Sequence, residues 1–176
     1  LMVSPGEGGN ASGSFRYRAG RLGYKTPAYD VAAYTGDTRI DATGSSLVQT
    51  GVYGSWVVQP GMSVMGSVTR SSYRDSKQLH WMGGIRAGVG PWVLKASYNR
   101  VDQQGVDAAG ASIAANDVRQ FAIGADYLLS RRTVLYVTAA SLKNQGNARF
   151  AIPGGPGVAA AGSSSSGYDL GLRHSF

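Results

Sequence analysis

The chain has 176 residues, enough for one domain, and its lack of Cys excludes disulfides and thiolate metal sites. Its formal net charge is +7, but no basic cluster accompanies a recognition motif, so nucleic-acid binding is not indicated. Mean hydropathy is −0.14, and the absence of any run of ~18 apolar residues excludes a transmembrane helix but not strands whose two faces differ in polarity.

Residues 1–13 are rich in Gly, Ser and Asn, which predicts a loop. Alternation of apolar and polar residues then predicts nine strands. They lie at 14–24, 29–35, 47–58, 62–70, 78–89, 92–101, 117–129, 133–143 and 167–176. The pattern is clearest at 78–89, where every second residue from Leu79 to Val89 is uncharged and Arg86 falls on the other face. At 133–143 both faces are too similar for the pattern to assign an apolar side.

The connections between these strands alternate in length. Tight turns are predicted at 25–28, 59–61, 90–91 and 130–132, and longer polar loops at 36–46, 71–77, 102–116 and 144–166. Outer-membrane barrels combine tight periplasmic turns with longer extracellular loops, whereas a soluble β-sandwich has no reason to sort its loops in this way. The predicted fold class is therefore all-β, a portion of an antiparallel transmembrane β-barrel with about nine strands.

The last ten residues alternate strictly. One face carries Tyr168, Leu170, Leu172, His174 and Phe176, and the other carries Asp169, Gly171, Arg173 and Ser175. About ten residues is the length that a tilted strand needs to cross a bilayer. The pattern predicts the closing strand of an outer-membrane barrel.

This ending resembles a known family. A final amphipathic strand that ends in Phe is shared by bacterial outer-membrane barrels, and residues 171–176 (GLRHSF) resemble the ending of trimeric general porins from Gram-negative bacteria. Residues 130–136 (SRRTVLY), preceded by Asp126 and Tyr127, resemble a turn and strand near the porin C-terminus, and residues 24–27 (YKTP) resemble another porin turn. Where the family usually has an aromatic residue two positions before the end, this chain has His174.

The resemblance implies a homotrimer in the bacterial outer membrane, surrounded by lipid, that passes small hydrophilic solutes and ions through a water-filled lumen. It also implies that the terminal strand carries the signal for the barrel-assembly machinery. The residues of that signal would be Tyr168, Leu170, Leu172 and Phe176.

Nine strands would start the chain outside the cell, whereas complete single-chain barrels have an even number of strands. We therefore expect residues 1–176 to be one domain, the C-terminal part of a 16-stranded porin barrel without its N-terminal part. The resemblance implies that the constriction loop, which follows the third strand in the family, belongs to the missing part.

Charged residues fall on the polar faces of the predicted strands, which would line water in a wide barrel. The candidate pore-lining residues are Arg16, Arg18, Arg86, Lys95, Asp126 and Arg173. Cations in a channel wall attract anions, so an anion-preferring channel is expected. Some of these cations could instead pair with Asp30, Asp126 and Asp169 and stiffen the wall.

Aromatic residues cluster near the strand ends, on faces that lack charge. The candidates are Trp56, Trp81, Trp92, Tyr98, Tyr127 and Tyr168. Two girdles at the lipid–water interfaces require this placement. Ordinary cross-strand aromatic packing is the alternative, and the absence of charge on these faces favours girdles.

No catalytic set is present in the sequence, so no enzyme, cofactor or metal site is expected. His174 and Ser175 are adjacent, but neighbouring residues of a strand point to opposite faces. The main alternative is a complete eight-stranded outer-membrane barrel with a structural or adhesive role and no open pore, and a soluble β-sandwich lectin is a second. A narrow barrel fills its interior with large side chains, whereas the predicted inward positions include small ones. These are Gly20, Gly51, Gly84, Gly88, Gly124 and Gly171.

Overall fold

The computed structural model describes residues 2–4, 16–39, 45–154, 157 and 160–176. In these ranges the chain forms ten strands. They are β1 (Met2–Ser4), β2 (Tyr17–Lys25), β3 (Tyr29–Arg39), β4 (Ser46–Gln59), β5 (Met62–Tyr73), β6 (Ser76–Val89), β7 (Trp92–Gly105), β8 (Val118–Leu128), β9 (Thr133–Asn144) and β10 (Ser164–His174). Within the same ranges no helix is long and apolar enough to cross a membrane.

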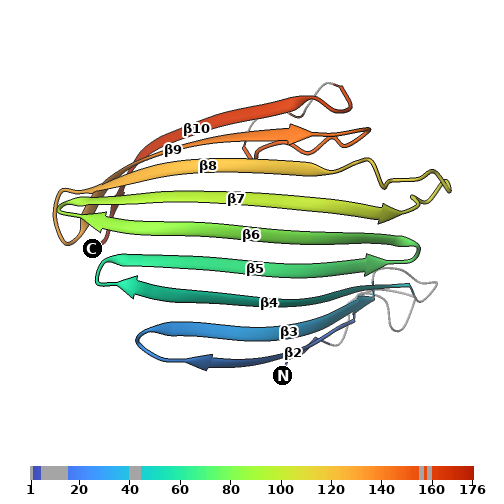
Figure 1. Cartoon of the computed structure of the whole chain (residues 1–176), viewed down its shortest axis with the longest axis horizontal. Coiled ribbons are helices and arrows are strands. Elements are labelled where there is room, and N and C mark those ends of the chain that lie inside the picture. Colours follow the sequence, from blue (N-terminus) through green and yellow to red (C-terminus); the bar gives the residue numbers. More distant parts are fainter. Residues whose placement is uncertain (1, 5–15, 40–44, 155–156, 158–159) are drawn as a thin grey trace.

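All ten strands belong to one antiparallel sheet, in the order of the sequence from β1 to β10. Each strand from β2 to β9 pairs with the strand before it and the strand after it, and Figure 1 shows the resulting meander. β1 and β10 are the two edges of this sheet and do not pair with each other. The all-β, antiparallel prediction is confirmed, and the described part is neither the double sheet of a sandwich nor an eight-stranded barrel.

One strand was absent from the sequence prediction. β1 lies in the segment 1–13 that was expected to be loop, and it pairs with β2 from Met2↔Ala19 to Ser4↔Tyr17. A strand of three residues is too short to show alternation, so pairing alone defines it. The rest of that segment lies outside the described residues.

The connections follow the predicted alternation of short turns and longer loops except at one place. Residues 71–77 were expected to be a loop, but β5 and β6 continue through them and turn at residues 74–75, where Arg74 has a φ of 51°. The pairs Ser71↔Gln78 and Ser72↔Lys77 extend the ladder to this turn. The end of this hairpin extends past the apolar part of the outer face and is polar on both faces. Its sequence therefore lacks the alternation of apolar and polar residues and resembles that of a loop.

The pairing gives the sheet two faces of different chemistry. One face, called here the outer face, includes a row of directly paired residues across five strands. This row is Leu22, Ala33, Val52, Val68 and Trp81. The opposite face, called here the inner face, carries polar and charged side chains together with small residues. The assignment that the sequence left open at β9 is settled by register, because Val137 pairs with Ala125 and Leu170 of the outer face.

The outer face has no protein packed against it in the described ranges. Leu22 is 82% exposed, Tyr168 is 91% exposed and Leu170 is 78% exposed. Apolar side chains at this exposure require an apolar medium around them, because contact of such an area with water is unfavourable. The sheet thus has one apolar face, the outer face, and one polar face, the inner face.

Candidate functional site

The inner face is the candidate site because it gathers charged side chains from strands far apart in the sequence. Its charged strand residues are Arg21, Lys25, Asp30, Arg86, Lys95, Asp126, Asp169 and Arg173. Four of the predicted pore-lining residues, Arg86, Lys95, Asp126 and Arg173, are therefore on one face, as the sequence suggested.

These four form a connected group, called here the cationic cluster. Lys95 Nζ donates a hydrogen bond to Asp126 Oδ1 at 2.6 Å, and Arg173 Nη2 lies 3.8 Å from Asp126 Oδ2. Arg86 lies directly opposite Lys95 and forms no ion pair with a described residue. Like charges directly opposite each other are unfavourable, which explains why Lys95 turns toward the neighbouring strand and Asp126. The cluster contains three cations and one carboxylate, so it is net positive.

Small residues beside the cluster let long side chains lie along the wall. The Lys95 Cε atom is 3.7 Å from the place where a Cβ of Gly124 would be, and Thr138 Oγ1 is 3.1 Å from that place. At Gly171, a Cβ would overlap the ring of Tyr136, whose Cε1 atom is at 2.8 Å. Glycine at position 171 is what allows Tyr136 to rest against the sheet, whereas a Cβ at position 124 would meet Lys95 at ordinary van der Waals distance.

A second charged group lies on β2 to β4. Arg21 Nε donates to the Tyr53 hydroxyl at 2.8 Å, and the guanidinium lies 5.4 Å from the centre of the Tyr53 ring. Lys25 Nζ is 3.5 Å from Asp30 Oδ2, and Arg21 is 4.0 Å from Asp30 Oδ1. Sequence reasoning missed Arg21 and Lys25 as wall residues, although their spacing of four on a strand places them on one face opposite Leu22 and Tyr24.

The predictions for Arg16 and Arg18 are wrong. Arg18 pairs with Asp37 on the same side as Leu22 and Tyr24, which is the outer face. Arg16 precedes β2, and its carbonyl oxygen accepts a hydrogen bond from the Arg39 amide, so alternation places it on the side of Arg18.

This wrong assignment of faces arose at the loop-side end of β2. Aromatic residues there suggested that the face containing Tyr17 was the apolar one. The half of β2 near the short turn decides otherwise, because Leu22 and Tyr24 pair with Ala33 and Val31 of the outer face. Gly20, predicted inward, is also on the outer face. Phe15, on which the prediction also depended, lies outside the described residues.

The connection between β9 and β10 is fixed to the inner face at its loop-side end. Asn144 is 2% exposed, and its Nδ2 donates to the carbonyl oxygens of Phe150 and Ser163. Ile152 donates its amide to Ser165 Oγ at 3.2 Å, and its Cγ2 atom lies 3.4 Å from the place of a Gly167 Cβ. The loop therefore covers part of the inner face, a feature for which the sequence carried no signal beyond the length of the segment.

The six candidate girdle residues all lie on the outer face. Trp92 and Tyr127 are directly opposite each other near the short turns, with ring centres 4.7 Å apart. Trp81 and Tyr98 lie nearer the long loops, with ring centres 5.3 Å apart. Trp56 pairs with Tyr29 and Val64 near the short turns, and Tyr168 pairs with Ala139. All six rings therefore face outward, and Trp92–Tyr127 and Trp81–Tyr98 make cross-strand contacts.

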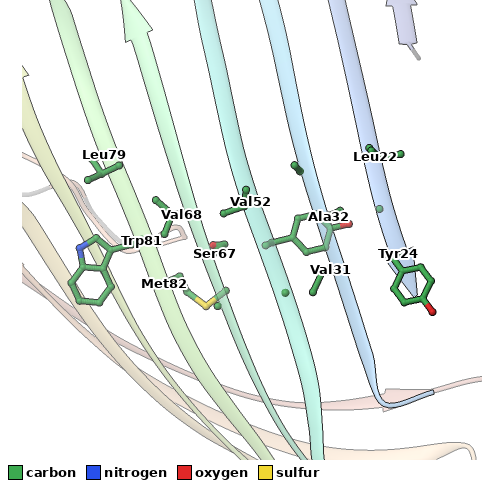
Figure 2. Close-up of a pocket in the computed structure, with 15 residues that line it drawn as sticks. Leu22, Tyr24, Val31, Ala32, Val52, Ser67, Val68, Leu79, Trp81 and Met82 are labelled. Carbon is green, nitrogen blue, oxygen red and sulfur yellow. The ribbon is translucent and has the colours of Figure 1, made fainter. Parts of the chain in front are cut away.

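Between β2 and β6 the outer face is hollowed into an apolar groove of about 1230 Å³. Figure 2 shows Tyr24 and Trp81 at its two sides, with Val31, Val52 and Val68 between them. Gly54 and Gly66 are part of its lining. A groove with this lining suits hydrocarbon and offers little to a polar solute.

The predicted assembly residues are at the open edge of the sheet. Tyr168, Leu170 and Leu172 lie on the outer face of β10, whereas Phe176 follows the end of the strand with its ring 5.0 Å from that of His174. The His174 Nδ1 atom is 2.9 Å from Thr133 Oγ1. Across the described part of the chain, no group of three or more His, Cys, Asp or Glu side chains is placed to hold a metal ion.

Comparison with known proteins identifies a family and several solved structures of similar fold. The family model for Gram-negative porins matches residues 1–147. A search of curated proteins found no match. Solved structures that resemble the chain include the anion-selective porin from Comamonas acidovorans, with a TM-score of 0.80 and 23% identity over 96% of this chain and 51% of that one.

Two structures of OmpT from Vibrio cholerae are also similar in fold. The form folded in vitro gives a TM-score of 0.64 and 13% identity over 90% of this chain and 56% of that one. The outer-membrane-expressed form gives a TM-score of 0.64 and 12% identity over 91% of this chain and 56% of that one. The chain thus spans about half the length of each of these solved proteins.

Proposed function

Because the chain belongs to the Gram-negative porin family and hence to the bacterial outer membrane, we propose that its inner face lines a water-filled channel for small hydrophilic solutes and ions. The observation that carries this proposal is the separation of the two faces, since one continuous sheet is apolar outside and charged inside. In a wide membrane barrel the outward band meets lipid and the interior meets water. The mechanism is passive, with pore width and wall charge acting on the solute.

We also propose that the channel prefers anions. The charged strand residues of the inner face comprise five cations and three carboxylates. In the cationic cluster, Arg86 is unpaired among the described residues and Asp126 is shared by Lys95 and Arg173. The solved Comamonas acidovorans protein, which this chain resembles in fold, is described as anion-selective.

The remaining parts of the proposal concern assembly and placement. The aromatic side chains of the outer face would form two bands, one at each lipid–water interface. The terminal strand, through Tyr168, Leu170, Leu172 and Phe176, would be recognised by the barrel-assembly machinery. The functional form would be a homotrimer, as implied by the resemblance of the ending to trimeric porins.

The test is the sign of the reversal potential. Protein extracted from outer membranes is placed in a planar bilayer with a KCl gradient. We expect stepwise conductance with a reversal potential closer to the equilibrium potential of Cl⁻ than to that of K⁺. A pore that prefers K⁺ would reject the anion preference but not the channel. Absence of any conductance from folded protein would reject the channel itself.

A further inference from the structure

The inner face has a hollow beside the cationic cluster, called here the wall hollow. Its volume is about 430 Å³, and its lining includes Met65, Met82, Gly84, Arg86, Lys95 and Asn99. Small-molecule sites in proteins have volumes of roughly 300–1,000 Å³, so the wall hollow has room for one small solute. Unlike the apolar groove of the outer face, the wall hollow has charged side chains in its lining.

Two methionine side chains form an apolar part of the wall hollow. Met82, Gly84 and Arg86 occupy alternate positions of β6 and so share the inner face, and Met65 of β5 lies directly opposite Gly84. The Met65 Cγ atom is 3.2 Å from the place of a Gly84 Cβ, so the Met65 side chain lies against this glycine. Met65 is nevertheless 37% exposed, which leaves an apolar and adaptable side chain in contact with the proposed lumen.

One cation beside this apolar surface has no partner among the described residues. Arg86 forms no ion pair with them, whereas Lys95 Nζ is bound to Asp126 Oδ1 at 2.6 Å. The wall hollow therefore offers one uncompensated positive charge, which matches a solute with a single negative charge. A carboxylate fits this cation, because two N–H groups of a guanidinium can donate to its two oxygens.

We propose that the wall hollow binds small monocarboxylates with an apolar body, the carboxylate on Arg86 and the body on Met65 and Met82. A chloride ion would use only the charge, and a polyhydroxy acid would gain nothing from the methionine side chains. The inference rests on the proposed function, because it requires the inner face to line the channel. It adds a class of preferred solute to the general preference for anions.

The experiment uses the protein extracted from outer membranes, recorded as single pores in a planar bilayer in about 0.1 M KCl, where charges are only moderately screened. Hexanoate is compared with gluconate, since both are six-carbon monocarboxylates but only hexanoate has an apolar body. The concentration of each that halves the Cl⁻ conductance measures its affinity. Hexanamide is the analogue that keeps the apolar body and lacks the charge.

Two substitutions on β5 form a matched pair. Met65→Ser removes an apolar side chain from the wall hollow. Met62→Ser makes the same change on the outer face of the same strand, because Met62 pairs with Ala87. A third variant, Arg86→Gln, removes the cation and keeps a side chain of similar length.

We expect hexanoate to halve the Cl⁻ conductance of the unsubstituted pore at a concentration about tenfold lower than gluconate, which is the value of burying roughly two methylene groups. Met65→Ser should reduce this preference to about threefold or less, and Met62→Ser should leave it near tenfold. Arg86→Gln should weaken both carboxylates by a similar factor. Hexanamide should not lower the conductance at concentrations where hexanoate halves it.

Equal affinities for hexanoate and gluconate in the unsubstituted pore would overturn the proposal in favour of a wall that attracts any anion. Hexanamide acting as strongly as hexanoate would overturn it by showing that the charge is not used. The same holds if Met65→Ser and Met62→Ser keep the same preference, since the methionine of the wall hollow would then contribute nothing.

A second variant keeps the proposal testable if Met65→Ser assembles poorly. Met65→Gln preserves the length of the side chain and makes it polar, and it should also reduce the preference for hexanoate, with Met62→Gln as its control. An unchanged preference in Met65→Gln would contradict the site. The Cl⁻ conductance separates the two levels of inference, because a conducting, anion-preferring pore without preference for hexanoate rejects only the wall hollow as a binding site.

Discussion

At the residue scale, Asp126 determines how the cations of the inner face are distributed. It is 8% exposed, and it holds Lys95 at 2.6 Å and Arg173 at 3.8 Å. One carboxylate cannot neutralise both, and Arg86 has no partner among the described residues. The excess positive charge is therefore on the wall itself, where water screens it over a Debye length of about 10 Å at 0.1 M salt.

Replacing Arg86 and Lys95 together with Glu should move the reversal potential in a KCl gradient toward cation selectivity. The change removes two positive charges per pore and adds two negative ones, and its effect should be larger at low salt because screening is weaker there. Reversal potentials of single pores at several salt concentrations measure the shift.

The control for this variant is Arg16→Glu with Arg18→Glu, which makes the same change of charge on the outer face. It should shift the reversal potential much less. An equal shift in the two variants would mean that overall charge, and not the position of Arg86 and Lys95, sets the selectivity.

At the scale of the element, β9 shows how register decides a question that its own sequence leaves open. Leu135, Val137 and Ala139 differ little in polarity from Tyr136, Thr138 and Ala140. Pairing with Tyr127 and Leu172 places Leu135 outside, and pairing with Asp126 and Gly171 places Tyr136 inside. The neighbours on both sides thus assign the faces of the strand.

Two adjacent substitutions in β9 test this assignment. Val137→Lys places a cation on the lipid side and should destabilise the folded protein by about 2–4 kcal/mol if it lies near the bilayer midplane. Thr138→Lys places the same side chain in the proposed lumen, where it should cost much less and strengthen the anion preference. Unfolding in urea from lipid vesicles measures both, and a larger cost for Thr138→Lys would show that the faces are reversed.

The terminal strand allows a test of the proposed assembly signal. Phe176 lies beyond β10 and its ring contacts that of His174, so its removal leaves the ladder with β9 intact. Deleting Phe176 should sharply lower the amount of protein in outer membranes, with Ser175→Ala as a control that leaves the aromatic ending unchanged. Normal amounts of folded trimer after the deletion would reject the role of Phe176 in assembly.

At the scale of the whole molecule, the important feature is the open sheet. β1 and β10 form its two edges, and neither is paired on its free side with another described strand. In lipid each unpaired backbone group costs several kcal/mol, so spanning barrels are closed. Figure 1 shows β10 and β2, the strand to which β1 is paired, on opposite sides of the meander.

We expect residues 1–176 alone not to form a stable pore. The purified chain should give no regular unitary conductance in a planar bilayer, whereas the protein extracted from outer membranes should do so under the same conditions. A regular, reproducible conductance from residues 1–176 would contradict this expectation and would show that the chain closes a barrel, by itself or with copies of itself.

The sequence by itself determined the features that depend on local alternation. Strict period-two patterns at 78–89 and 167–176 predicted strands whose faces the structure confirms up to His174, where β10 ends, because each side chain's face follows directly from its position in a strand. The same patterns placed Arg86, Lys95, Asp126 and Arg173 on polar faces, and the structure brings these four residues to one face of one sheet.

Only the tertiary structure decided the features that depend on pairing. Arg18 and Arg21 lie on opposite faces of β2, and the sequence around Tyr17 favours the wrong one until pairing with β3 fixes the register. Pairing also revealed β1, turned the expected loop at 71–77 into a hairpin, and brought Met65 opposite Gly84. The physical reason is that alternation reports only that two faces differ, whereas hydrogen bonds between neighbouring strands decide which residues share a face.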